Sequence, residues 1–347
     1  VMVGVGKAAE AGVLIRNGEA LQSASKITTM VLDKTGTITE GAPKVTDVVI
    51  ASAHNQDDVL SLAASLESGS EHPLAMAIVE SAKEQGVPIH SVTDFESIAG
   101  KGVAATLNSQ RLLFGNEKLM KEKSIELHHY VDKAQRLAAE AKTPMYFAID
   151  SKLVAVIAVA DPIKSDSIDA INRLQHNGIR VVMLTGDNRM TAKAVARKAG
   201  IVDYVAEVMP EDKANKVLEL QREGEIVGMT GDGINDAPAL AHANVGFAIG
   251  TGTDVAIESA DITLMRGSLH GLADAIAVSK ATLRNIKQNL FGAFIYNVAG
   301  IPFAAGVFYP FLGLLLSPVI AGAAMAFSSL TVVTNANRLR LFKAKEH

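Results

Sequence analysis

Short apolar runs that stop at polar clusters recur along the chain. Segments with helical spacing follow two of them, Met190 to Ala199 and Ala237 to Ala241. Buried strands that alternate with helices predict a parallel sheet with helices on both faces. Because ligands bind at the carboxyl ends of such strands, we expect the polar clusters to meet at one site. The runs are Ile27 to Leu32, Ile179 to Leu184, and Glu225 to Thr230.

An insert separates the first of these strands from the others. Between about residues 45 and 152, apolar positions first recur at helical spacing and then form short strand-like runs between turn residues. The strand-like runs are Val103 to Leu107, Arg111 to Phe114, and Met145 to Ile149. An insert of this size predicts an α+β domain of its own, joined by two crossings to the first domain.

The pattern changes near the end of the chain. From Gln288 to Asn337, 50 consecutive residues include no Asp, Glu, Lys, Arg or His. A membrane-spanning helix needs about 20 apolar residues, so the stretch predicts two spans and a short turn. Basic residues flank both ends, which favours a hairpin with both ends in the cytoplasm. A buried pair of soluble helices is the alternative, although such helices rarely continue so far without a charge.

These patterns divide the chain into six parts. They are a stalk or linker at 1–26, a parallel-sheet domain at 27–44 and 153–267, an inserted domain at 45–152, a stalk helix at 268–287, two transmembrane helices at 288–337 and a cytoplasmic tail at 338–347.

Composition excludes several classes of function. The 347 residues carry 33 Lys plus Arg against 37 Asp plus Glu, and this formal charge of -4 leaves no excess of cations to bind nucleic acid. The absence of cysteine excludes a disulfide scaffold, a thiolate zinc site and a cysteine nucleophile within this chain. The charge is uneven, because basic residues outnumber acidic ones from Gly271 onward and the rest of the chain is acidic.

The pentapeptide Asp33-Lys34-Thr35-Gly36-Thr37 carries the strongest chemical signal. An acidic residue at the open end of a strand can attack a phosphoryl group, while the N–H groups of the following Gly-containing turn hold the phosphoryl oxygens. The plain alternative is an Asp that begins a turn, as in most Asp-x-x-Gly stretches. A second matching motif makes that alternative negligible.

The second motif runs from Gly231 to Asp236 with the sequence Gly-Asp-Gly-Ile-Asn-Asp. A carboxylate here, near Asp33, can hold Mg²⁺, a hard cation that binds few carboxylates together with phosphate oxygens. The alternative is that Asn235 and Asp236 cap a helix, and capping and chemistry can coexist.

Two weaker signals complete the set. Thr185-Gly186-Asp187 offers a hydroxyl to a phosphate oxygen, although Thr-Gly-Asp alone is usually a turn. Lys213 can neutralise phosphate charge as a point cation, although a lone lysine is usually a solvated surface residue.

Together these motifs resemble those of the P-type ATPases, cation pumps whose catalytic domain has the haloacid-dehalogenase-like fold. The resemblance covers essentially the whole chain, and it implies a phosphorylation domain that contains the parallel sheet and a nucleotide-binding domain at 45–152. It implies Asp33 as the phosphorylated nucleophile, Asp33, Thr35 and Asp232 as Mg²⁺ ligands, Thr185 and Lys213 as phosphate contacts, Asn235 and Asp236 as supports, and Asp187 as a further member of the catalytic set.

A motif in the insert resembles one branch of the P-type ATPases in particular. Ser70-Glu-His-Pro-Leu resembles the Ser-Glu-His-Pro-Leu motif of the heavy-metal branch, in which the imidazole of His72 would contact adenine. Without the resemblance, His72 would read as a histidine at a helix start. No Gly-x-x-x-x-Gly-Lys-Ser/Thr occurs, so the chain is not a P-loop NTPase. The implied nucleotide-binding residues are Glu67, His72, Gly100, Gly102, Gly115 and Asn116.

Few polar side chains interrupt the uncharged stretch. Neither predicted span offers a carboxylate or imidazole to a hard or divalent ion, which points to a soft monovalent ion, Cu(I), with Ag(I) chemically indistinguishable. Tyr-Asn in the first span and Met-x-x-Ser-Ser in the second resemble the copper-pump pattern. The implied exit-side ligands are Tyr296, Asn297, Met325 and Ser329. The alternatives are helix packing by the serines and apolar filling by the methionine.

Two features of such pumps are absent from this chain: a Cys-Pro-Cys on an earlier span and the Thr-Gly-Glu loop of an actuator domain. We expect both before Val1, so the chain is interpreted as the C-terminal part of a bacterial copper-exporting pump of the inner membrane, with cytoplasmic catalytic domains. The implied cofactors are ATP and Mg²⁺. The implied partners are Cu(I) or Ag(I), membrane lipid, the upstream part of the pump and a copper chaperone, but not nucleic acid.

Three other readings stay open. One is a soluble phosphohydrolase of the same fold, against which the uncharged stretch argues. Another is a pump for a divalent metal such as zinc. The third is a catalytically idle membrane regulator, which the intact Asp33, Asp232 and Lys213 disfavour.

Overall fold

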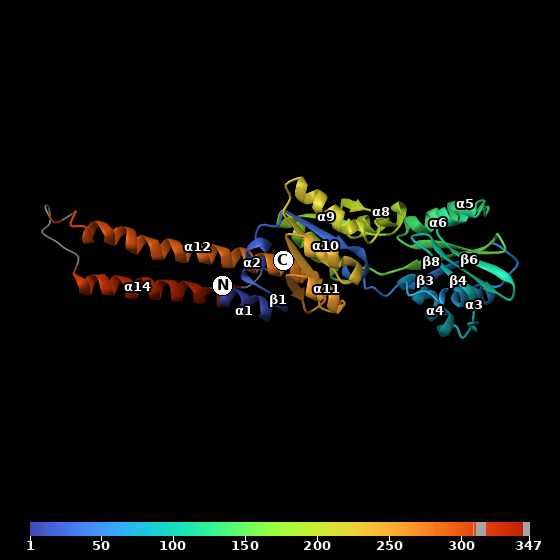
Figure 1. The fold of residues 1–347 in the computed structure, drawn as a ribbon, viewed down its shortest axis with the longest axis horizontal. Coiled ribbons are helices and arrows are strands. Elements are labelled where there is room, and N and C mark those ends of the chain that lie inside the picture. Colours follow the sequence, from blue (N-terminus) through green and yellow to red (C-terminus); the bar gives the residue numbers. More distant parts are fainter. Residues whose placement is uncertain (308, 310–316, 343–347) are drawn as a thin grey trace.

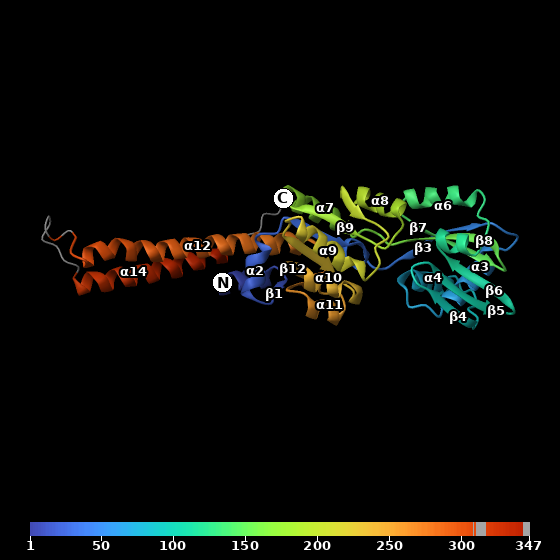
Figure 2. The ribbon, with the colours of Figure 1, turned by 45° about the horizontal axis from the view of Figure 1, so that its top comes forward.

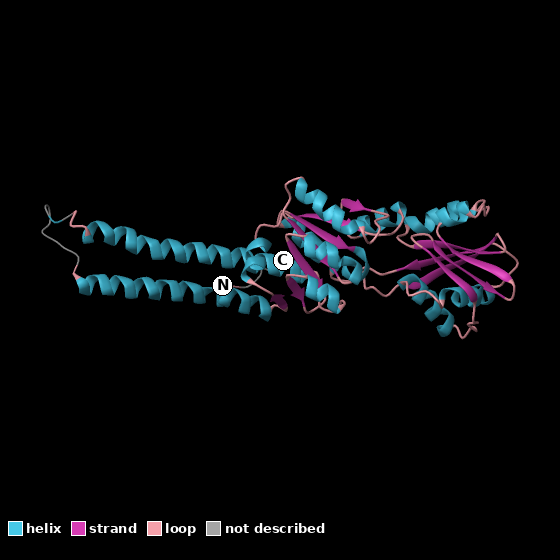
Figure 3. Ribbon diagram, in the orientation of Figure 1, coloured by secondary structure: helices cyan, strands magenta, loops and turns pink. Residues whose placement is uncertain are grey.

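The computed structural model describes residues 1–307, 309 and 317–342, and it arranges them in three parts along one long axis (Figure 1). A domain built on a seven-stranded sheet lies in the middle and a domain built on a six-stranded sheet lies at one end. Two long helices extend from the other end, and the two sheets stand apart in the view coloured by secondary structure (Figure 3). We call the two sheet domains the middle domain and the inserted domain.

The sheet of the middle domain confirms the predicted parallel arrangement. Its strand order is β1-β13-β12-β11-β2-β9-β10, and all neighbouring strands are parallel except β1 and β13. The three strands predicted from apolar runs are the adjacent strands β11, β2 and β9. The strands are β1 (Val13–Ile15), β2 (Thr29–Asp33), β9 (Arg180–Leu184), β10 (Asp203–Val205), β11 (Val227–Gly231), β12 (Val245–Ile249) and β13 (Ile262–Leu264).

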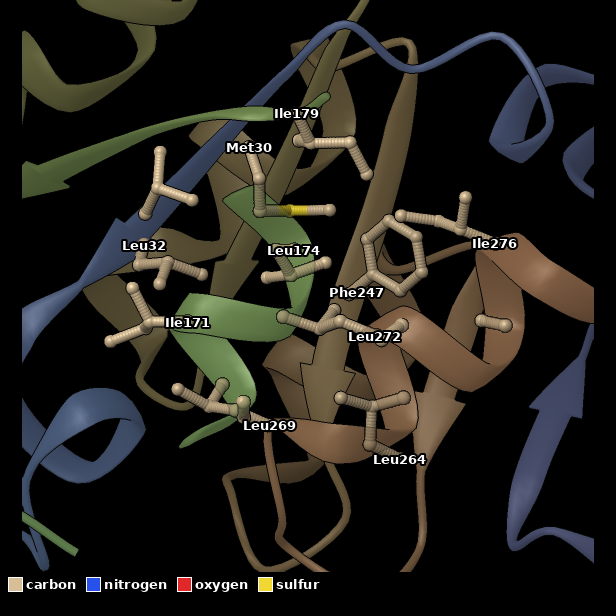
Figure 4. Packing of buried hydrophobic residues seen from close by; sticks show 14 of the residues in the cluster. Met30, Leu32, Ile171, Leu174, Ile179, Phe247, Leu264, Leu269, Leu272 and Ile276 are labelled. Atoms are coloured by element: carbon tan, nitrogen blue, oxygen red, sulfur yellow. The ribbon is translucent and has the colours of Figure 1, made fainter. Parts of the chain in front are cut away.

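Helices cover both faces of this sheet, as the pattern predicted. Side chains along β2 point alternately to the two faces of the sheet. Met30 and Leu32 belong to the buried cluster on one face, and Val31 belongs to the cluster on the other. Figure 4 shows the first cluster, where Leu174 and Leu272 pack beside Met30 and Phe247. That face carries α2 (Gly18–Ala24), α7 (Ser167–His176), α8 (Arg189–Lys198) and the start of α12 (His270–Ala304), and the other carries α9 (Asp212–Arg222), α10 (Ala237–His242) and α11 (Asp254–Ser259).

The inserted domain is an antiparallel sheet with helices on both faces. Its strand order is β3-β8-β7-β6-β5-β4. The strands are β3 (Lys44–Ile50), β4 (Thr93–Ile98), β5 (Gly102–Leu107), β6 (Gln110–Gly115), β7 (Thr143–Ile149) and β8 (Lys152–Ala160). One face carries α3 (Gln56–Glu67) and α4 (Pro73–Glu84), and the other carries α5 (Glu117–Glu122) and α6 (Tyr130–Ala139).

Two predicted boundaries need adjustment. β8 belongs to the sheet of the inserted domain, so this domain continues to about residue 160 instead of ending at 152. Both faces of β8 are buried, which makes its sequence as uniformly apolar as that of a strand in a parallel sheet. The segment 1–26 is not only a stalk, because β1 pairs with β13 at the edge of the middle sheet.

The end of the chain folds into a pair of long helices, α12 (His270–Ala304) and α14 (Pro318–Asn337), that lie side by side in both ribbon views (Figures 1 and 2). Asparagine side chains join them near the end of α14 that lies toward the middle domain. The Asn285 amide donates to the Asn335 carbonyl over 2.8 Å, and the Asn335 amide donates to Asn289 Oδ1 over 2.8 Å. We call α12 and α14 the helical hairpin.

Among the described residues, no helix is both long enough and apolar enough to cross a membrane. The predicted pair of helices is present as this helical hairpin, and neither described helix meets that criterion. Lys280, Arg284 and Lys287 occupy the first half of α12, and hydroxyl and amide side chains interrupt α14. Residues 308, 310–316 and 343–347, which include part of the predicted transmembrane stretch at 288–337 and half of the predicted tail, lie outside the described residues.

Candidate active site

The polar clusters that follow three neighbouring strands meet at the carboxyl edge of the middle sheet. β2 lies between β9 and β11 and is parallel to both, so its last residue, Asp33, lies between Thr185 and Asp232. The chain turns sharply after Asp33, because Gly36 has a φ of +70° in the loop that follows. Segments far apart in the sequence are thus brought to one place by strand order.

Three carboxylates form the centre of this site. Asp33, Asp232 and Asp236 each offer an oxygen atom, and these atoms lie within 4.8 Å of one another. We call these residues the acidic trio. Lys213 Nζ donates to Asp33 Oδ1 over 2.8 Å and to Asp236 Oδ1 over 2.7 Å. Asp236 Oδ2 also accepts the backbone N–H groups of Asp232 and Gly233, so Asp236 is held from several sides.

Burial and the charge of Asp236 raise the pKa values of Asp33 and Asp232. Burial, followed by the charge of Asp236, raises the pKa of Asp33 to about 7, although Lys213 opposes the change. The same two causes raise the pKa of Asp232 to about 6, and Lys164 opposes them. Burial opposes protonation of Lys213, but Asp33 and Asp236 outweigh it and raise the pKa of the lysine. The ionised trio therefore carries more negative charge than Lys213 balances.

The trio fits a hard divalent cation such as Mg²⁺. Carboxylate oxygens are the ligands that Mg²⁺ prefers, and the surplus negative charge favours a cation beside Asp33 and Asp232. Gly36 leaves the room for this arrangement, because a Cβ atom there would lie 1.7 Å from Asp232 Oδ2. Thr35 lies half-buried on the same loop, and its role as a magnesium ligand stays a prediction.

Replacing Gly36 with Ala is expected to weaken Mg²⁺ binding at least about tenfold, because the new methyl group displaces the Asp232 carboxylate. The left-handed backbone should also cost about 1 kcal/mol of unfolding free energy. Gly178→Ala is the matched control, since Gly178 has a φ of +75° and its Cβ atom would meet nothing within 4 Å. Calorimetric Mg²⁺ titration and urea unfolding check both changes. Equal Mg²⁺ affinity in the two variants would contradict the placement of the cation beside Asp232.

A second group of bonds lies next to the trio. The buried Thr185 hydroxyl accepts the N–H of Asp187 over 3.1 Å, and Lys34 Nζ donates to Asp187 Oδ2 over 2.7 Å. Burial opposes protonation of Lys34, but Asp187 outweighs it and raises the pKa of the lysine. Thr143, in the inserted domain, donates to Asp187 Oδ1 over 3.4 Å. Asp187 thus links the loop that follows Asp33 with the inserted domain.

Sequence reasoning missed part of this group. Lys34 stands inside the quoted pentapeptide, so its position beside Asp33 was a usable signal. No sequence feature singles out Thr143, which reaches Asp187 only through the arrangement of the two domains. Asn235, predicted as a support, is exposed, whereas its neighbour Asp236 is buried and bonded to Lys213.

The predicted nucleotide residues lie in the inserted domain. Glu67 ends α3, and burial raises its pKa to about 7 although Ser70 opposes the change. His72 Nδ1 accepts the N–H of Leu74 over 3.2 Å and caps α4, so its plain structural role at a helix start is real. Burial and the charge of Lys34 lower the pKa of His72 while Asp187 opposes them. The His72 side chain is exposed in the inserted domain, and its contact with adenine stays a prediction.

The predicted glycines bring backbones close together. Gly102 and Gly115 lie opposite each other in β5 and β6, and a Cβ atom on Gly102 would lie 2.1 Å from the Phe114 carbonyl oxygen. Asn116 donates to the Gly100 carbonyl over 2.9 Å and caps α5 with its side-chain oxygen. Close packing explains these residues without a ligand, and contact with a nucleotide stays a prediction.

The predicted copper ligands lie on the helical hairpin. Tyr296 is 38% exposed and Met325 is 60% exposed. Asn297 and Ser329 are also exposed, and the Asn297 amide donates to the Ala293 carbonyl of its own helix over 3.0 Å. In the helical hairpin alone, these four side chains are therefore exposed and do not enclose a metal site.

Comparison with known proteins relates this site to a family. The haloacid dehalogenase-like hydrolase family matches residues 27–244. The copper-exporting P-type ATPase of Legionella pneumophila is 54% identical over 340 residues, which are 98% of this chain and 46% of that protein. The silver exporting P-type ATPase of Salmonella typhimurium is 51% identical over 98% of this chain and 41% of that protein. The chain thus spans less than half the length of these curated relatives.

Solved structures show the same architecture. A zinc-transporting PIB-type ATPase in its E2.Pi state aligns with 98% of this chain and 54% of its own, at 33% identity and a TM-score of 0.72. The catalytic domain of the CPx-ATPase CopB-B aligns with 79% of this chain and 98% of its own, at 30% identity and a TM-score of 0.61.

Proposed function

Because the chain belongs to the haloacid dehalogenase-like hydrolases, and among them to the copper-exporting P-type ATPases, we propose that it forms the catalytic part of a pump that exports Cu(I) or Ag(I) through a phospho-aspartate at Asp33. The observation that carries the proposal is the contact of Lys213 with Asp33 inside the acidic trio at the carboxyl edge of the sheet. The candidate nucleophile Asp33, the lysine that neutralises its charge and a candidate site for a divalent cation thus lie next to one another.

Phosphoryl transfer requires positioning and charge neutralisation more than covalent chemistry. Lys213 holds Asp33 Oδ1, so the other carboxylate oxygen attacks the γ-phosphorus while the bond to the bridging oxygen breaks and ADP leaves. Thr185 and Lys213 contact the transferred phosphoryl oxygens, and Asp187 orients Lys34 beside the nucleophile. Mg²⁺ bound at Asp33 and Asp232 supplies further neutralisation of the phosphoryl charge.

The inserted domain is proposed to hold ATP through Glu67, His72 and the loop around Gly100. Three contacts support a position of this domain over the active site. Thr143 bonds Asp187, Lys118 Nζ lies 3.4 Å from Glu207 Oε2, and a Cβ atom on Gly100 would lie 3.3 Å from Met209 Sδ. A nucleotide held by the inserted domain would thus present its phosphates to Asp33.

Replacing His72 with Asn is expected to weaken ATP binding about tenfold, because the imidazole that contacts adenine is lost. Asparagine is a good N-cap, so α4 keeps its cap and the stability of the domain should change little. Phosphorylation of Asp33 from inorganic phosphate should continue, since that reaction needs no adenine. Calorimetric ATP titration measures the affinity, with the exposed His54→Asn as control. Unchanged ATP affinity would leave His72 as a helix cap only.

The helical hairpin is proposed to contact lipid and the other helices of the longer pump. An apolar surface of this extent marks an interface or a membrane contact, because water does not favour it. The two helices expose large apolar side chains along their length, among them Phe291, Phe294, Val298, Ile301, Phe327 and Leu330. The exposure of Tyr296, Asn297, Met325 and Ser329 fits a metal site that further helices complete.

Copper selectivity is proposed to depend on Met325, a thioether ligand that suits a soft monovalent ion. In the pump restored to full length in membranes, ATP hydrolysis is expected to rise with Cu(I) or Ag(I) and not with Zn²⁺. Met325→Leu should lower the apparent affinity for Ag(I) about tenfold and leave ATP affinity unchanged. Val333→Leu, on the same helix, is the matched control. Stimulation by Zn²⁺ alone would favour a divalent pump instead.

A further inference from the structure

Lys164, which is not one of the predicted site residues, binds two segments that are far apart in the sequence. Lys164 Nζ donates to the Gly36 carbonyl over 2.7 Å and to the Gly267 carbonyl over 3.1 Å. Gly36 lies in the loop that follows Asp33, and Gly267 lies three residues before His270, the first residue of α12. A single half-buried ammonium group thus joins the active site to the base of the helical hairpin.

On the side of the active site, further hydrogen bonds hold the segment around Lys164 to the loop that follows Asp33. The backbone N–H of Lys164 donates to the Ile38 carbonyl over 3.1 Å, and the Ser167 hydroxyl donates to the same carbonyl over 2.8 Å. Ile163 also forms a β-bridge with Thr39. The segment around Lys164 is therefore bonded to the loop that begins at Asp33 at more than one point.

On the side of the helical hairpin, the base of α12 is also held by side-chain bonds. The Ser268 hydroxyl donates to Asp166, and Arg173 Nη2 lies 2.6 Å from Asp274 Oδ1 in the first turns of α12. Leu272 and Ile276 of α12 pack in the same buried cluster as Ile171 and Leu174 of α7 (Figure 4). The base of α12 is therefore held by α7 and by the segment that leads into it.

We propose that Lys164 is a positioning residue that transmits a change at the nucleophile loop to the base of α12. The inference rests on the proposed phosphorylation of Asp33. Phosphorylation adds negative charge and bulky oxygens at the end of β2, so the loop that contains Gly36 must adjust. Two charge-assisted hydrogen bonds from one ammonium group couple that adjustment to Gly267, because moving one carbonyl moves the bond to the other.

Amide hydrogen exchange of the present chain tests the inference. Beryllium fluoride with Mg²⁺ serves as the phosphoryl analogue, and exchange is read in residues 33–38 and 265–275. In the unchanged chain, we expect the analogue to slow exchange in both segments about tenfold, the factor that one charge-assisted hydrogen bond commonly gives. In Lys164→Gln, protection at 33–38 should persist while the effect at 265–275 disappears.

Controls separate transmission from structural support. Lys164→Arg should restore the effect at 265–275, because the guanidinium group can donate to both carbonyls. Lys216→Gln removes the same charge from an exposed pair on α9 and should behave as the unchanged chain does. An effect at 265–275 that survives in Lys164→Gln, or its absence in the unchanged chain when 33–38 is protected, would overturn the inference. Absence of protection at 33–38 in the unchanged chain would instead overturn the proposed phosphorylation, and the inference with it.

Discussion

Asp33→Asn is expected to lower phosphorylation of the chain by ATP at least about a thousandfold, because an amide oxygen is a far weaker nucleophile than a carboxylate. The substitution keeps the size of the side chain and an oxygen that can accept from Lys213. Radiolabelled ATP measures the reaction, with an acid-stable, hydroxylamine-sensitive phosphoprotein as the product. A phosphoenzyme of normal amount in Asp33→Asn would show that another residue is the nucleophile.

The same substitution should stabilise the fold at neutral pH. The folded-state pKa of Asp33 is raised from 3.8 to about 7, so the fold favours the protonated carboxyl group and loses stability as pH rises between these values. Asparagine is neutral at every pH and avoids this loss. The gain in unfolding free energy should therefore be largest above pH 7 and vanish near pH 4. Urea unfolding at several pH values checks the direction, and a gain that grows toward pH 4 would contradict it.

Lys213→Met is expected to cost about 3 kcal/mol of unfolding free energy and to abolish phosphorylation. The substitution leaves Asp33 and Asp236 buried and close together without their shared cation. Without the lysine the pKa of Asp33 rises further, so the loss of stability should shrink as pH falls and the carboxyl group takes up a proton.

Lys216→Met is the matched control for this loss. Lys216 lies on the same helix and pairs with Glu219 over 2.6 Å, but both side chains are exposed, so its loss should cost less than about 0.5 kcal/mol. Urea unfolding of both variants at pH 5 and pH 8 measures the difference. Equal effects of the two substitutions would show that Lys213 does not neutralise a buried pair.

The fold could be predicted where hydrophobic periodicity is unambiguous. The runs before Asp33, Thr185 and Asp232 became the three adjacent strands β2, β9 and β11, because a buried parallel strand leaves a continuous apolar run in the sequence. The domain boundary at residue 152 was wrong, because it separates β8, an antiparallel strand buried on both faces, from the sheet to which it belongs. The hydrophobic pattern of a strand indicates how deeply the strand is buried, but it does not indicate which sheet the strand joins.

The candidate site was predictable only in part. Asp33, Asp232 and Lys213 stand in motifs whose chemistry can be read from residue type and from position at strand ends. Lys164 and Thr143 act through contacts between domains and with backbone carbonyls, and such contacts leave no pattern in the sequence. The predicted copper ligands illustrate a further limit, because the two described helices leave Met325 exposed and do not enclose a metal site.

The asparagine bonds between α12 and α14 have a mechanical consequence. They fix the two helices to each other at the end nearest the middle domain, so the hairpin turns there as one lever arm. From Asn285 to Ala304, α12 continues for 20 residues, which at 1.5 Å per residue gives an arm of about 30 Å. A rotation of only about 5° at the asparagine bonds would therefore move the far tip by about 3 Å, more than an ångström-scale adjustment at Gly267 could produce by translation alone.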